Sequence, residues 1–133
     1  MKNFIYTANP SRVVFGVGAL QHLAREIELF GARRALVLST PEQADSARRV
    51  ATLLGDRAVG IFARAVMHVP IETAREARDE ARRLGADCAV AIGGGSTTGL
   101  GKAIALLDAL DAPPLEDAAP PRGAGAPPLD DAA

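Results

Sequence analysis

The stretch AIGGGSTTGLGKAIAL, residues 91–106, decides the fold class of this 133-residue chain. It begins at the end of an apolar run, residues 88–92, and leads through glycines and hydroxyl residues into an apolar helical pattern. Glycines allow a phosphate to approach the backbone closely, and the first N–H groups of a helix attract an anion. We therefore predict a phosphate-binding loop between a buried strand and a helix, with a plain glycine turn as the alternative. The candidate ligands are Gly93, Gly94, Gly95, Ser96, Thr97 and Thr98.

Two better-known phosphate motifs do not fit this chain. Gly16-Val17-Gly18 begins a dinucleotide fingerprint, but Gln21 stands where the third glycine belongs, so a strand-to-helix turn is the better interpretation. Lys102 lacks the glycine spacing and the following Ser or Thr of a P-loop. It either faces the ligand cleft or covers the helix surface.

Upstream of the loop the chain alternates between strand and helix patterns. Short apolar runs at residues 12–15, 35–39, 58–62 and 88–92 suit strands that are covered on both faces. Three helical patterns separate them, with Gly31, Gly55 and Gly85 at their ends and a capping box in residues 40–43. This order predicts an α/β fold: a doubly wound, Rossmann-like half with a parallel sheet and helices on both faces. Residues 4–7 are a further candidate strand.

Composition divides the chain near residue 110. Residues 1–110 carry 14 basic and 11 acidic side chains, whereas residues 111–133 carry one Arg, five acids and six of the nine prolines. We expect an α/β domain over 1–110 and a disordered tail over 111–133. A net charge of −1 argues against a nucleic-acid binder, and no apolar run is long enough to span a membrane. With one cysteine and no signal peptide pattern, we expect a cytoplasmic protein.

A family resemblance rests on three segments. GGGSTTGLGKAIAL, with FGVGAL near the start and ALVLST at the second run, resembles the N-terminal part of maleylacetate reductases. These enzymes belong to the iron-containing (group III) alcohol dehydrogenase superfamily. The resemblance covers residues 1–106, and it departs from the broader superfamily at Gly99 and Gly101, where Asp and Ala are usual. That variant points to the maleylacetate branch.

The resemblance implies a chemistry. Members bind NADH or NADPH, and maleylacetate reductases reduce the carbon–carbon double bond of 2-maleylacetate to give 3-oxoadipate in aromatic degradation. Residues 94–98 match the pyrophosphate loop, and Ser39 and Thr40 match the strand end that contacts the adenosine ribose. Because Thr40 is uncharged, we expect weak discrimination between NADH and NADPH, although Thr40 is equally suited to be a helix cap. Full-length relatives are expected to be homodimers.

Few other residues are candidates. His68 follows the third run and either lines the cofactor cleft or is a partly exposed loop residue. His22 fits a helix surface, and Cys88 fits a buried, inert thiol. No catalytic residue and no metal ligand can be named.

After residue 106 the resemblance ends. The family continues with a helical domain that carries the metal or substrate pocket, and we expect that domain to be absent. The Pro- and Ala-rich ending suggests a truncated or frameshifted gene whose product is inactive alone. The alternatives are a non-catalytic dinucleotide-binding remnant and the N-terminal part of another iron-containing alcohol dehydrogenase.

Overall fold

A computed structural model describes residues 11–111, and from Gly16 onward they belong to one compact unit. The strands are β1 (Ala35–Leu38), β2 (Ala58–Phe62) and β3 (Cys88–Ala91). The α-helices are α1 (Leu23–Phe30), α2 (Ala44–Leu54), α3 (Ile71–Arg83) and α4 (Gly95–Asp111). Short 3-10 helices, η1 (Ala19–His22), η2 (Pro41–Gln43) and η3 (Gly55–Arg57), adjoin them.

The three strands form a parallel sheet in the order β2-β1-β3. Leu38 at the end of β1 pairs with Phe62 at the end of β2 and with Ala91 at the end of β3. All three carboxyl ends therefore lie at one edge of the sheet. The predicted parallel α/β architecture is confirmed.

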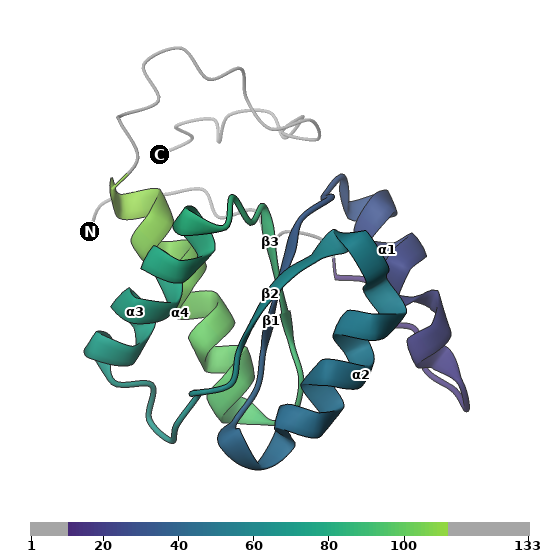
Figure 1. The fold of residues 1–133 in the computed structure, drawn as a ribbon, viewed down its shortest axis with the longest axis horizontal. Coiled ribbons are helices and arrows are strands. Elements are labelled where there is room, and N and C mark those ends of the chain that lie inside the picture. Colours follow the sequence, from purple (N-terminus) through teal and green to yellow (C-terminus); the bar gives the residue numbers. More distant parts are fainter. Residues whose placement is uncertain (1–10, 112–133) are drawn as a thin grey trace, which may run out of the picture. The chain divides into compact units, whose positions relative to one another are not determined.

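Helices cover both faces of the sheet, so two apolar cores form (Figure 1). On one face, Leu36 and Leu38 of β1 pack with residues of α3 and α4. On the other face, Ala35 and Val37 pack with residues of α1 and α2. Side chains alternate between the faces along a strand, and this explains why the central strand is buried throughout and reads as a continuous apolar run.

Glycine follows α1, α2 and α3 as predicted, although Gly55 after α2 has φ 59° with ψ −131° and is therefore not in the left-handed helical conformation. Gly31 after α1 has φ 85° and Gly85 after α3 has φ 64°, the left-handed conformation that glycine adopts without a Cβ penalty. The N–H of Ala86 donates to the carbonyl of Ala81 at 2.9 Å, which closes the end of α3. The alanine stripe of α3 also has the predicted place, since Ala74 and Ala77 are buried against the sheet.

Three local predictions are wrong. Residues 12–15 form no strand, because within residues 11–111 no strand pairs with this run and supplies ladder hydrogen bonds. The capping box at residues 40–43 is absent: Thr40 makes no side-chain cap hydrogen bond, and a 3-10 turn precedes α2 instead. Leu20 and Phe30, part of the apolar pattern of the first helix, are exposed, and only Ile27 of α1 is fully buried.

Other predictions concern the ends of the chain. The candidate strand at 4–7 lies outside the described residues, and so does the predicted tail apart from its first residue. That residue, Asp111, ends α4 and forms an ion pair with Arg78 of α3. Among the described residues, none of the helices has the length and apolar character that crossing a membrane requires.

Candidate functional site

The glycine loop, residues 93–98, connects the carboxyl end of β3 to the first turn of α4. Two hydrogen bonds hold it together. The hydroxyl of Thr97 donates to the carbonyl of Gly94 at 3.0 Å, and the N–H of Thr98 donates to the same carbonyl at 3.2 Å. The N–H groups in the first turn of a helix have no carbonyl partner within that helix. The N–H groups of residues 95–97 are therefore available to a ligand.

Open space lies in front of this turn. A Cβ atom built on Gly94 or Gly95 would meet no atom within 4 Å, and neither residue has a positive φ. Packing therefore does not require glycine at either position. The absence of side chains leaves the backbone open to a ligand at the positive end of the α4 dipole.

Gly93 differs from its two neighbours. Its φ is 118°, and a Cβ atom at this position would overlap with the side-chain oxygen of Gln43. Gln43 ends η2, so the turn that follows β1 lies directly against the glycine loop. Sequence reasoning missed this side chain as part of the site. The only feature of the sequence that points to Gln43 is that residues 40–43 directly follow the strand that lies beside β3.

The predicted phosphate ligands differ in access. Gly94, Gly95 and Thr98 are exposed and Ser96 is half-buried, so a ligand can reach all four. Thr97 is fully buried, and its hydroxyl is used within the loop. Its place in the site is therefore that of a support for the loop.

The two residues predicted to contact the ribose, Ser39 and Thr40, also differ in their access to a ligand. Ser39 is fully buried, and in this conformation no face of its side chain is open to a ligand. Its hydroxyl has no hydrogen-bond partner within residues 11–111. Thr40 is half-buried, and its hydroxyl hydrogen-bonds to the exposed carboxylate of Glu42. The pKa of Glu42 is lowered by hydrogen bonds, first from its own backbone and then from Thr40.

His68 belongs to a strained loop that approaches α4. His68 has φ 64° and Val69 has φ 43°, values that are unusual for any residue with a Cβ and especially for a β-branched one. A Cβ atom on Gly99 would lie 3.0 Å from Cγ2 of Val69, so the departure from the superfamily at Gly99 makes room for this loop. His68 itself is exposed.

Lys102 lies one turn beyond Thr98 on α4, and both side chains line an open cavity of about 630 Å³ beside α1 and β3. Glu26 and Phe30 of α1 line the same cavity. Lys102 thus lies on the side of α4 that carries Thr98, the exposed end of the glycine loop. Lys102 is exposed, and the choice between a place in the ligand cleft and a place on the helix surface stays a prediction.

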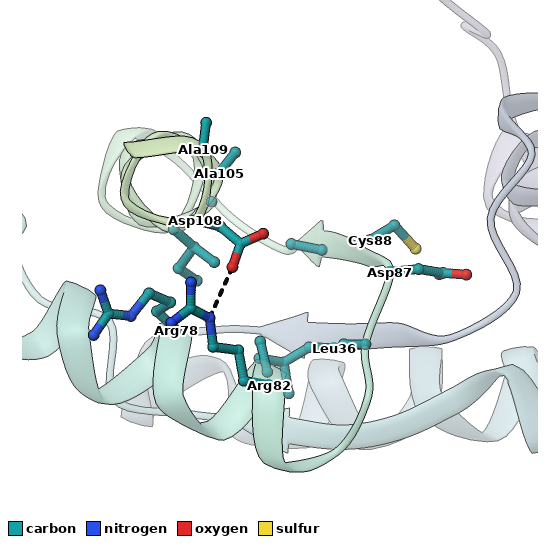
Figure 2. A pocket seen from close by; sticks show the side chains of 13 residues that line it. Leu36, Arg78, Arg82, Asp87, Cys88, Ala105, Asp108 and Ala109 are labelled. Carbon is teal, nitrogen blue, oxygen red and sulfur yellow. Dashed lines mark hydrogen bonds and ion pairs between the residues drawn. The ribbon is translucent and has the colours of Figure 1, made fainter. Parts of the chain in front are cut away.

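A second cavity, of about 320 Å³, lies between α3 and α4 near the amino end of β3 (Figure 2). We call it the α3–α4 cavity. Arg82 of α3 and Asp108 of α4 form an ion pair of 2.9 Å at it, and Leu36 and Ala105 add apolar surface. Because Cys88 at its wall begins β3, the cavity lies at the opposite end of the strand from the glycine loop.

No metal site can be assembled from the described residues. Residues 11–111 contain no group of three or more His, Cys, Asp or Glu side chains placed to hold an ion. Cys88 is partly buried, and burial raises the pKa of its thiol to about 11. The thiol is thus protonated at neutral pH, the form that does not bind metals.

Comparison with known proteins identifies the family. The sequence profile of iron-containing alcohol dehydrogenases matches residues 10–129, which extends beyond the motifs that carry the resemblance in the sequence. A maleylacetate reductase of Burkholderia cepacia is 72% identical over 110 residues, which are 83% of this chain and 31% of the relative. A maleylacetate reductase of Sphingobium indicum is 56% identical over 112 residues, 84% of this chain and 31% of the relative.

A solved structure gives the same result. The crystal structure of a maleylacetate reductase from Agrobacterium tumefaciens aligns with a TM-score of 0.73 and 51% identity, over 80% of this chain and 31% of that one. The chain therefore spans about 31% of the length of these relatives. The iron that the family name implies finds no fitting group of ligands within residues 11–111. The profile match over most of the sequence and the identity to maleylacetate reductases show that this chain belongs to the iron-containing alcohol dehydrogenase family.

Proposed function

We propose that this chain binds the pyrophosphate of NADH or NADPH at the glycine loop. The observation that carries the proposal is the open space at Gly94 and Gly95, in front of the unpaired N–H groups of α4. Ser96 and Thr98 supply further hydrogen-bond donors, and Thr97 and Gln43 hold the loop in shape. Thr40, His68 and Lys102 belong to the surroundings of the same site. The domain that carries it comprises residues 1–110.

The reaction in this proposal is the reduction of the double bond of 2-maleylacetate to 3-oxoadipate. Its support is the similarity to proteins named maleylacetate reductase. The bound nicotinamide would supply the hydride. The described residues would bind and orient the cofactor, and their loop hydrogen bonds would keep the first turn of α4 ready for the pyrophosphate. The cytoplasmic location and the homodimer that the resemblance implies are part of the same proposal.

Calorimetric titration of the 133-residue protein with NADH and with NADPH tests the binding step. Gly94→Val puts a branched side chain into this open space; its Cβ would have no neighbour within 4 Å and Gly94 has no positive φ, so the fold should survive. We expect the affinity to fall at least about tenfold, a loss of roughly 1.4 kcal/mol.

Gly101→Ala is the matched control, because it lies outside residues 93–98 and its Cβ would make an ordinary contact of 3.6 Å with the buried Leu38. Its affinity should equal that of the original chain. Equal affinities of the Gly94→Val variant and the original chain would show that the pyrophosphate does not bind at this loop.

We further propose that the 133 residues by themselves bind the cofactor without turning over maleylacetate. Hydride transfer requires that both reactants be held in position, and that positioning supplies much of the rate. The resemblance assigns substrate binding to a helical domain, and the relatives are about three times as long as their matched part. Following NADH oxidation with maleylacetate tests this: turnover at roughly 1–10³ s⁻¹ would contradict it.

A further inference from the structure

We propose that Val69 is a positioning residue for the dinucleotide site: seated against Gly99, it braces the first turns of α4 and holds the glycine loop ready for the pyrophosphate. The inference rests on the proposed function, because it gives a residue outside the loop a role in that site. Val69 itself needs no contact with the cofactor, since it acts through α4.

Val69 comes from a different part of the chain than the loop it supports. It lies in the segment between β2 and α3, which meets the start of α4 at one end of the sheet (Figure 1). A Cβ atom on Gly99 would lie 3.0 Å from Cγ2 of Val69, closer than side chains ordinarily approach one another. Val69 therefore occupies the space that a side chain at residue 99 would need.

The glycine loop is held at both ends in the same way. At Gly93 the missing Cβ makes room for the carboxamide of Gln43, from the turn after β1. At Gly99 it makes room for Val69, from the segment after β2. Residues 94–98, which include the glycines that face open space, lie between these two contacts. A loop that is fixed before its ligand arrives loses less conformational freedom on binding, and it therefore binds more tightly.

The seat of Val69 is determined by the surrounding fold. His68 has φ 64° and Val69 has φ 43°, the left-handed region that a β-branched residue rarely adopts. Such conformations persist only where neighbouring structure imposes them. The side chain of Val69 packs on the core formed with α3 and α4, and its N–H donates to the carbonyl of Val66 at 3.3 Å. A change of size at Gly99 therefore acts on the whole segment that Val69 anchors.

Changes of size on the two sides of the contact test this role. Val69→Ala removes the methyl group that touches α4, whereas Gly99→Ala adds a methyl group and displaces Val69. In the double variant the added methyl group takes the place of the removed one. Calorimetric titration of the 133-residue protein with NADH and with NADPH gives the dissociation constants. Each single substitution should weaken the binding of both cofactors about threefold or more, and the double variant should bind within about twofold of the original chain.

Two matched variants separate positioning from general stability. Val50→Ala makes the same truncation in the core on the other face of the sheet, so it should lower Tm and leave both affinities unchanged. Gly101→Ala makes the same addition two residues further along α4, without the close contact, and should also leave both affinities unchanged. Should a truncated variant fail to fold, the comparison of Gly99→Ala with Gly101→Ala decides the question, because neither of these removes core atoms.

Each contrary result has a distinct meaning. Unchanged affinity in Gly99→Ala, or an equal loss in Gly101→Ala or Val50→Ala, would overturn the role of Val69 while leaving the proposed dinucleotide site standing. A double variant that binds no more tightly than the single variants would overturn it as well. If the original chain bound neither cofactor, the dinucleotide site and this inference would fall together.

Discussion

Gly101→Ala should stabilise the chain. Gly101 lies in the interior of α4, it has no positive φ, and a Cβ atom there would lie 3.6 Å from Cδ1 of Leu38, an ordinary van der Waals distance. No other atom would lie within 4 Å of the added methyl group, so it fits without a clash. Alanine fits this backbone and packs against an existing apolar side chain.

The gain has two parts. Replacing glycine by alanine in a helix interior contributes about 0.8–1 kcal/mol, chiefly because the unfolded chain loses freedom. Burying half of one methyl group adds about 0.4 kcal/mol, since Gly101 is half-buried. The free energy of unfolding should rise by about 1.3 kcal/mol, which corresponds to an increase in Tm of about 5–10 °C for a domain of this size.

Thermal unfolding followed by circular dichroism, with a urea titration beside it, measures the change. Gly99→Ala is the matched control in the same helix: its propensity gain is equal, but its Cβ would lie only 3.0 Å from Cγ2 of Val69. Val69 belongs to a strained loop and must move, so Gly99→Ala should stabilise less than Gly101→Ala or destabilise. A lower Tm for Gly101→Ala, or a larger gain for Gly99→Ala, would refute the reasoning.

Three further predictions concern single side chains. The pKa of Asp87 lies below its ordinary 3.8 because backbone N–H groups of Arg34 and Arg33 donate to its carboxylate. Its contribution to stability is therefore present above about pH 4 and is lost as the pH falls through the folded-state value. Asp87→Asn should lower Tm at pH 7, and a Tm difference that does not shrink towards pH 3 would count against this. The Cys88 thiol, with a pKa raised to about 11 chiefly by burial, should be alkylated by iodoacetamide at a rate that rises up to about pH 11; a plateau near pH 9 would contradict it. Ser39→Ala removes a buried hydroxyl without a partner, so Tm should not fall and cofactor affinity should not change.

Local patterns predicted the elements around β1 correctly. The continuous apolar runs at residues 35–39, 58–62 and 88–92 became the three parallel strands. Burial on both faces accounts for the run in β1, whereas β2 and β3 are edge strands of the described sheet and are partly exposed. Gly31 and Gly85 end helices because the left-handed conformation is a property of one residue and its neighbours. The prediction failed at residues 12–15, where an apolar run alone cannot supply the neighbouring strand that ladder hydrogen bonds need.

For the candidate site, the sequence by itself determined where a glycine loop follows a strand, because residues 93–98 are consecutive and glycine has no Cβ. Only the tertiary structure decided which distant side chains surround that loop. Gln43 reaches Gly93, and Val69 reaches Gly99, because β1 and β3 are neighbours and the loop after β2 approaches α4. The tertiary structure also buries Ser39, which the sequence predicts to contact the ligand, beneath other atoms. Hydrophobic periodicity and turn residues encode local conformation, whereas these contacts depend on strand order and register, which arise only when the whole sheet has packed.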